Sequence, residues 1–175
     1  MCDIVSQMNE SLLVVRGPIG VGKSSVSLSL HEQMADHSSI IETDVLKHMV
    51  GPNGSSHWRR DIAHDAAAFM VERLLAVPRT PIVEVHTKYP HEVDRYAAMA
   101  ANLSVPLVNV LLTAPLEVCR ERTVGRAMPG VNYTPDYSLI DTYYCNLDPR
   151  PGDLVYDTAS MGIEEITASV MSAIS

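Results

Sequence analysis

The chain has 175 residues, of which 46% are hydrophobic and 19% are charged, and this composition excludes global disorder. Its length suits one compact domain over residues 1–175. The formal net charge of −8 argues against a general nucleic-acid surface, which needs a basic stripe.

The N-terminus and the cysteines bear on where the protein works. The segment MCDIVSQMNE contains two acids and no long apolar run, so we expect neither a signal peptide nor an anchor. No apolar run approaches the length of a membrane span. The three cysteines lack C-x-x-C spacing and the histidines lack H-E-x-x-H spacing, which argues against disulfides and zinc. We therefore expect a cytoplasmic protein without a membrane partner.

Strand-like and helix-compatible segments alternate along the whole chain. This alternation predicts an α/β fold in which a five-stranded parallel sheet carries helices on both faces. The expected strands are Leu12–Arg16, Ser39–Thr43, Pro81–His86, Pro106–Thr113 and Asp153–Tyr156. The expected helices are Lys23–Ala35, Val45–Met49, Trp58–Ala76, Pro90–Asn102, Leu116–Arg122, Tyr137–Cys145 and Ile163–Ile174.

The segment GPIGVGKSS follows the first strand and matches the phosphate-binding pattern G-x-x-x-x-G-K-[ST]. Backbone N–H groups in such a loop turn toward an anion, together with the N-terminus of the following helix. Lys23 is expected to reach the β- and γ-phosphates, and the Ser24 hydroxyl to bind Mg²⁺. The alternative is a glycine-rich turn without a ligand. The candidate nucleotide-binding residues here are Gly17, Gly20, Val21, Gly22, Lys23, Ser24 and Ser25.

Asp44 ends the second apolar run, in the segment IIETDVLKHM, and so lies at the mouth of the expected sheet. Ligands of doubly wound folds gather beyond the carboxyl ends of the strands. There Asp44 can accept a proton from a substrate hydroxyl that attacks the γ-phosphate. The alternative, which is compatible with catalysis, is an N-cap for a short helix that begins at Val45. Glu42 alternates to the same strand face and is a weaker candidate.

The segment SSHWRRD begins the third expected helix. Arg59 should point into the protein, where it can hold a phosphate or an anionic substrate group. Arg60 lies about 100° around the helical wheel and is expected to be exposed. Trp58 either covers a hydrophobic substrate or packs against the protein. Arg59 extends one face of this helix, and we expect that face to pack on the sheet. The other members of the face are Ile62, Ala66, Phe69, Met70, Arg73 and Leu74.

Glu84 interrupts the apolar third strand in the segment TPIVEVHTKYP. An unpaired buried carboxylate is costly, so Glu84 needs a partner. Mg²⁺ or its water shell beside the phosphate loop can be that partner. The alternative is an edge-strand charge that faces water. His86 points the same way, and it either lines the substrate cleft or is structural.

The segment EVCRERTVGRAMPG follows the fourth strand. Arg122 and Arg126 share a helical face, and Gly125 allows the chain to hinge. Such arginines can close over a nucleotide and stabilise charge on the transferring phosphoryl group, which predicts a short lid at about residues 120–135. The alternative is a solvated helix in which Glu117 and Glu121 pair with arginines.

Together, the phosphate loop, the acid after the second strand, the arginine segment and the closing VYDTASMGIEEI resemble the P-loop small-molecule kinases. The segments IETDVLKHM and IVEVH are most similar to the chloramphenicol phosphotransferase and zeta-toxin branch, and a tunicamycin-resistance-like protein is a related possibility. The resemblance implies Asp44 as the base, Arg126 as a lid residue and Arg122 at the adenine or phosphates. It also implies that the adenine lies near Asp157, Thr158 and Ala159.

The resemblance implies an ATP-dependent, Mg²⁺-dependent phosphotransferase that acts on a hydroxyl of an antibiotic, a nucleoside or another metabolite. The usual Asp-Arg pair after the third strand of nucleoside-monophosphate kinases is absent, which argues against a nucleotide acceptor. Two alternatives stay open. One is a nucleoside or polynucleotide kinase, and the other is a nucleotide-dependent binding protein that transfers no phosphoryl group. The sequence leaves the acceptor and the oligomeric state open.

Overall fold

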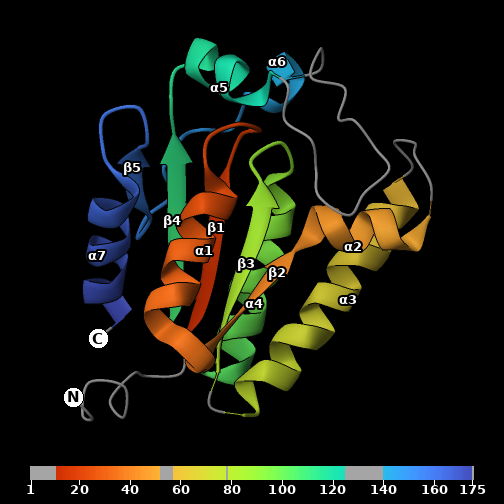
Figure 1. The fold of residues 1–175 in the computed structure, drawn as a ribbon. Coiled ribbons are helices and arrows are strands. Elements are labelled where there is room, and N and C mark those ends of the chain that lie inside the picture. Colours follow the sequence, from red (N-terminus) through yellow and green to blue (C-terminus); the bar gives the residue numbers. More distant parts are fainter. Residues whose placement is uncertain (1–10, 52–56, 78, 125–139, 175) are drawn as a thin grey trace.

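The structure is a computed structural model that describes residues 11–51, 57–77, 79–124 and 140–174. Five parallel strands form one sheet in the order β2-β3-β1-β4-β5 (Figure 1). The strands are β1 (Leu12–Gly17), β2 (Ser38–Glu42), β3 (Thr80–His86), β4 (Leu107–Thr113) and β5 (Leu154–Asp157). The predicted α/β fold with a five-stranded parallel sheet is therefore confirmed, and each observed strand ends within one residue of its predicted bounds.

Helices cover both faces of the sheet and its upper edge in Figure 1. They are α1 (Lys23–Met34), α2 (Thr43–Val50), α3 (His57–Leu75), α4 (Pro90–Leu103), α5 (Leu116–Thr123), α6 (Ile140–Tyr143) and α7 (Ile163–Ile174), with a short 3₁₀ turn, η2 (Ala35–His37), before β2. Helix α6 ends at Tyr143, two residues before its predicted end, and residues 137–139 of the predicted range lie outside the described part of the chain.

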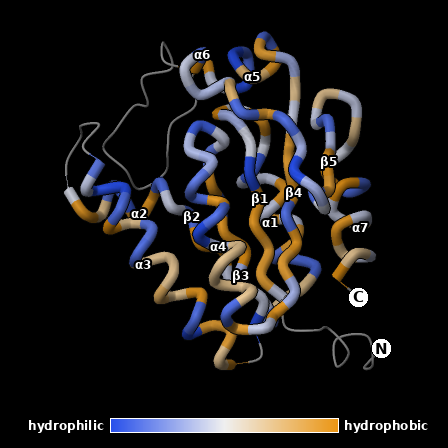
Figure 2. Tube along the Cα trace, turned by 180° about the vertical axis from the view of Figure 1, so that it is seen from behind, coloured by the Kyte–Doolittle hydropathy of each residue, from blue (hydrophilic) through white to orange (hydrophobic). Residues whose placement is uncertain are grey.

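Two apolar clusters form the core, one on each face of the sheet. Leu13 and Val15 of β1 pack with α1 and α7, whereas Leu12 and Val14 pack with α3 and α4. This division follows from the alternation of side chains along a strand. Figure 2 shows the hydrophobic strands between the helices. Because β1 is buried on both faces, its carboxyl end and the loop that follows it have a rigid support.

The predicted packing face of α3 is wrong. Ile62, Phe69 and Met70 are exposed, at 46%, 65% and 40%. Small side chains allow α3 to approach the sheet and α4 closely, so the face with alanines is buried in place of the face with the largest apolar residues. The buried residues of α3 are Arg59, Ala63, His64, Ala67, Val71 and Leu75. Arg59 does point inward as predicted, but it belongs to this alanine face.

Candidate active site

The phosphate-loop segment connects β1 to α1 at the carboxyl edge of the sheet. Gly20 and Gly22 have φ values of 80° and 103°, which favour glycine. A Cβ atom at Gly20 would lie 2.3 Å from the Cys119 carbonyl oxygen, so glycine is also required there by the close approach of α5. The Lys23 ammonium donates to the Gly17 and Pro18 carbonyl oxygens at 3.1 and 2.9 Å. The carbonyl groups of the loop thus hold the positively charged Lys23 ammonium group close to the loop backbone.

The N-terminus of α1 fits an anionic group. No side chain caps this helix, and its N-cap residue, Gly22, has no side chain to offer. The first N–H groups of a helix need a partner, and they carry a partial positive charge. A phosphate group meets both needs, and Lys23 adds a full positive charge beside it. The geometry therefore fits the predicted phosphate site.

Ser24 and Glu84 lie side by side next to this loop. The Ser24 hydroxyl donates to Glu84 Oε2 at 3.0 Å, and the other carboxylate oxygen is buried without a hydrogen-bond partner among the described residues. Burial raises the pKa of Glu84 and Glu42 adds to the rise, whereas the Lys23 charge and the Ser24 and Ser27 hydroxyls oppose it. A divalent cation would satisfy the orphaned oxygen and neutralise the buried charge. These two residues therefore fit the predicted Mg²⁺ site.

The alternative for Glu84, an edge-strand charge that faces water, is wrong. Strand β3 lies between β2 and β1, and Glu84 is 6% exposed. The described residues contain no group of three or more His, Cys, Asp or Glu side chains that could hold a metal. Mg²⁺ usually needs only one or two carboxylates, since waters and substrate phosphates complete its shell. A site with Ser24 and Glu84 is consistent with that chemistry.

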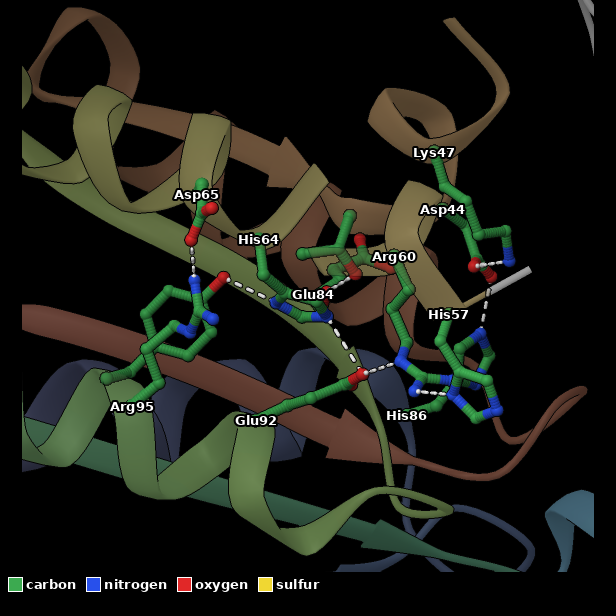
Figure 3. Close-up of polar contacts among 12 residues, drawn as sticks. Asp44, Lys47, His57, Arg60, His64, Asp65, Glu84, His86, Glu92 and Arg95 are labelled. Atoms are coloured by element: carbon green, nitrogen blue, oxygen red, sulfur yellow. Dashed lines mark hydrogen bonds and ion pairs between the residues drawn. The ribbon is translucent and has the colours of Figure 1, made fainter. Parts of the chain in front are cut away.

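Asp44 lies in the first turn of α2, beyond the end of β2. Its Oδ1 atom accepts from Lys47 Nζ at 2.6 Å, and its Oδ2 atom pairs with His86 Nε2 (Figure 3). Burial alone would raise the pKa of Asp44, but the charges and hydrogen bonds of His86 and Lys47 outweigh burial and hold it well below its usual value. The carboxylate is therefore ionised at neutral pH.

The predicted helix cap at Asp44 is wrong. Helix α2 begins at Thr43, two residues before Val45, and Glu42 occupies the N-cap position. The Thr43 hydroxyl donates to the Glu84 carbonyl oxygen at 2.8 Å and so ties the start of α2 to β3. The Asp44 side chain contacts His86 and Lys47 instead of capping the helix, and about a third of it is exposed.

The predicted nucleotide-binding residues of α5 and of the segment after β5 meet at the phosphate loop. Arg122 donates to the Thr158 hydroxyl and carbonyl oxygens, each at 2.8 Å, and to the Val21 carbonyl oxygen at 3.3 Å. The Thr158 hydroxyl donates to the same Val21 oxygen at 2.7 Å. The Asp157 carboxylate accepts from the Ala159 N–H at 2.9 Å. The structure thus brings Arg122, Val21 and Thr158 together, although their roles toward a nucleotide stay predictions.

The alternative in which Glu117 and Glu121 pair with the arginines of α5 is wrong, because neither forms such a pair among the contacts that the structure describes. Arg120 pairs with Asp141 of α6, and Arg122 contacts Thr158 and Val21 as above. Arg126 and most of the predicted lid at residues 120–135 lie outside the described residues.

The start of α3 differs in part from the prediction. Arg59 is buried and donates to the Gly51 carbonyl oxygen at 2.7 Å, so it joins the end of α2 to α3. Trp58 is 56% exposed and is not a core residue, which leaves its predicted substrate contact as a prediction. Arg60 was expected to be exposed but is largely buried. Its guanidinium lies 3.7 Å from the Tyr89 ring centre and pairs with Glu92 at 3.1 Å.

A buried polar network between α3 and α4 was not predicted from the sequence (Figure 3). Glu92 pairs with Arg60 and with His64, each at 3.1 Å, and the other ring nitrogen of His64 lies 3.0 Å from the Tyr96 hydroxyl. Arg60 and His64 are four residues apart, as are Glu92 and Tyr96. This matched helical spacing is the signal by which the sequence could have indicated a polar contact between the two helices.

A family model places the chain among known proteins. The model of the AAA domain family AAA_33 matches residues 12–139, which is more than half of the chain. The chain belongs to this AAA_33 family. The matched range includes the phosphate loop, Asp44, Glu84 and the whole of the expected lid segment at residues 120–135. No curated protein matches the sequence.

Solved structures similar to this AAA_33 protein span nearly its whole length. A gluconokinase from Sinorhizobium meliloti 1021 is 21% identical, with 96% of this chain and 93% of that chain covered and a TM-score of 0.66. The Mycobacterium tuberculosis APS kinase CysC in complex with AMPPNP and APS is 18% identical, with 94% and 96% covered and a TM-score of 0.73. A Deinococcus radiodurans tunicamycin resistance protein is 19% identical, with 94% and 95% covered and a TM-score of 0.62. These similarities show that the chain has the P-loop kinase fold.

One further observation concerns membranes. Among the residues that the structure describes, no helix has the length and apolar character needed to cross a bilayer.

Proposed function

We propose that this AAA_33 protein is an ATP-dependent kinase that transfers the γ-phosphoryl group of ATP to a hydroxyl of a small molecule. One observation carries the proposal. At a single edge of the sheet, β1 leads into an uncapped helix with Lys23, β3 carries Glu84 against Ser24, and β2 leads to the ionised Asp44. A phosphate cradle, a metal site and an acceptor-orienting carboxylate are the parts that phosphoryl transfer needs.

The chain's own residues would bind the nucleotide in the following way. The backbone N–H groups of residues 17–24, apart from Pro18, which has none, would hold the β- and γ-phosphates together with Lys23. Arg122 would lie at the adenine or the phosphates. Ser24 and Glu84 would hold Mg²⁺, which supplies charge neutralisation for the phosphates when it is bound. Arg126 and the predicted lid would exclude water from the reacting group.

Asp44 would orient the acceptor and receive its proton. The acceptor oxygen forms a bond to the γ-phosphorus, the bond from that phosphorus to the β,γ-bridging oxygen breaks, and ADP leaves. The acceptor proton passes to the Asp44 carboxylate. Because the pKa of Asp44 is low, this transfer occurs late, when the acceptor oxygen is already bonded to phosphorus and has become acidic. Phosphoryl transfer passes through a loose transition state, so the reaction needs correct orientation of the acceptor hydroxyl more than it needs a strong base.

The acceptor class is part of the proposal. We propose a small-molecule alcohol, in line with the resemblance to the chloramphenicol phosphotransferase and zeta-toxin branch. Two of the similar structures are a gluconokinase and a tunicamycin resistance protein, and these similarities support a sugar-like or antibiotic hydroxyl.

The test is incubation of the purified protein with MgATP and a panel of sugars, sugar acids, nucleosides and antibiotics, followed by mass spectrometry. The proposal expects one class to gain the mass of a phosphate with stoichiometric release of ADP. It expects Lys23→Ala and Asp44→Asn each to lose most of this activity, with Asp44→Asn still binding MgATP. Tight ligand binding with unchanged ligand mass would instead favour the nucleotide-dependent binding protein.

A further inference from the structure

His86 connects two parts of the active site. It is the last residue of β3, and in the sheet register it is paired with Gly17, where the phosphate loop begins. Its side chain reaches across to α2, where its Nε2 atom pairs with Asp44 Oδ2 (Figure 3). One side chain thus joins the strand beside the phosphate loop to the carboxylate proposed to receive the acceptor proton.

The His86 ring is held in place. Its side chain is largely buried, and the ring packs edge-on against Tyr143 of α6 at a centre-to-centre distance of 5.7 Å. Because an ionised carboxylate only accepts hydrogen bonds, the Nε2 atom must carry the hydrogen of this pair. The Nδ1 atom is buried and has no hydrogen-bond partner in the described part of the chain. Within that part, the ring directs its hydrogen bonding at Asp44.

Lys47 also contacts the Asp44 carboxylate, but it lies three residues later on the same helix. The Lys47–Asp44 contact therefore does not itself tie Asp44 to another element. Among the contacts of the Asp44 side chain that the structure describes, the one with His86 reaches a different element, β3, which is paired directly with β1. The Thr43 hydroxyl ties the start of α2 to β3, and the His86 contact adds a tie at the Asp44 carboxylate itself.

We propose that His86 is a positioning residue that fixes the Asp44 carboxylate relative to the phosphate loop and does not itself contact the acceptor. The inference rests on the proposed kinase function, and it changes the role expected of His86, from binding the substrate to placing the residue that does.

The proposal predicts an effect on transfer without an effect on nucleotide binding. Loss of a partner that orients a functional side chain typically lowers activity by about 10- to 100-fold. We expect this decrease in kcat for His86→Leu, which keeps bulk but loses the N–H group. The KM for MgATP should change by less than about 2-fold, since β3 still supports the loop through its backbone. His86→Gln places an amide N–H near the original Nε2 position and should restore most of kcat.

The experiment is a double-mutant cycle, with the acceptor found by the panel described above. His86→Leu and His86→Gln are measured in the wild-type chain and in Asp44→Asn. His31→Leu is the matched control, because His31 makes one comparable side-chain contact, to Ser38 at 2.8 Å, at the opposite end of the sheet. If His86→Leu does not unfold cooperatively on heating, His86→Asn replaces it, since its shorter amide cannot reach Asp44 in the same way.

The outcomes separate the two proposals. The positioning role is supported if His86→Leu lowers kcat, His86→Gln restores it, and His86→Leu adds no further loss in Asp44→Asn. It is overturned if the two losses multiply, or if His86→Leu matches the His31→Leu control. In either of these cases the kinase proposal stands. A wild-type protein that phosphorylates no acceptor overturns the kinase proposal and this inference with it.

Discussion

At the scale of single residues, two carboxylates of the active site have opposite environments. Asp44 is paired with two nitrogen groups, which hold its pKa well below the usual value, whereas burial raises the pKa of Glu84. An ionised Asp44 suits the orientation of a hydroxyl. The buried negative charge of Glu84 is destabilised, and a bound cation would neutralise it, which suits a metal ligand. Environments that push two pKa values apart assign the two carboxylates to different tasks.

The first prediction concerns Asp44 and pH. Since the folded-state pKa of Asp44 is lowered, wild-type activity should show no loss from Asp44 protonation between pH 7 and about pH 5, above the ordinary aspartate value of ~3.9. Lys47→Ala removes one lowering charge, so its activity should fall at a higher pH on acidification. The pH profiles of kcat/KM for the two proteins check this. If the two pH profiles fell at the same pH on acidification, Lys47 would not lower the pKa of Asp44.

The second prediction concerns Glu84 and stability. Because the folded-state pKa is raised, the ionised carboxylate destabilises the folded chain as pH rises through the unfolded-state value. Glu84→Gln should therefore raise the melting temperature at pH 7.5 without nucleotide, and the difference should shrink near pH 4. The same variant should lose the added stability that Mg²⁺ gives with ATP. Thermal unfolding at both pH values measures this, and a lower melting temperature at pH 7.5 would contradict it.

At the scale of elements, the sequence predicted the strands better than it predicted the helix faces. The phosphate-loop residues and Glu84 stood out because each breaks or ends an apolar strand. The buried face of α3 could not be predicted from apolarity, because close packing selected the small Ala63 and Ala67 over Phe69. The network around Glu92 was missed for a related reason, since the burial of His64 depends on partners that α4 supplies.

The third prediction compares two glycines with similar backbone conformations. Gly20 and Gly152 have φ values of 80° and 86°, but only Gly20 has close neighbours for an added Cβ. Gly152→Ala should lower the free energy of unfolding by about 1–2 kcal/mol, the cost of a left-handed conformation for alanine. Gly20→Ala should cost more and should also abolish MgATP binding, because the loop or α5 must shift. Urea denaturation and calorimetry check this, and equal costs would contradict it.

At the scale of the whole molecule, a buried ion pair joins distant parts of the chain. Arg16 of β1 pairs with Asp153, which precedes β5, and both side chains are almost fully buried. The same Asp153 carboxylate accepts from the Arg150 N–H at 2.7 Å, and Arg150 in turn pairs with Asp94 of α4. The segment before β5 is thereby tied to both β1 and α4. This pair could not be predicted from the sequence, because its partners are 137 residues apart.

The fourth prediction follows from that pair. Asp153→Asn leaves the Arg16 charge buried without a counter-charge, so it should lower the free energy of unfolding by about 3–5 kcal/mol. The double variant Arg16→Met with Asp153→Leu removes both charges and should recover much of that loss. Urea denaturation of the three proteins measures both effects. A loss of less than about 1 kcal/mol for Asp153→Asn would mean that the pair contributes little.

Nucleotide binding by the phosphate loop is tested by calorimetric titration of ATP into the protein with Mg²⁺, with and without the Lys23→Ala substitution. If residues 17–24 hold the triphosphate, the wild-type chain binds one MgATP per molecule, removal of Mg²⁺ weakens binding, and Lys23→Ala weakens it strongly. Absence of binding by the wild-type chain at saturating ATP, or unchanged affinity in Lys23→Ala, would contradict it.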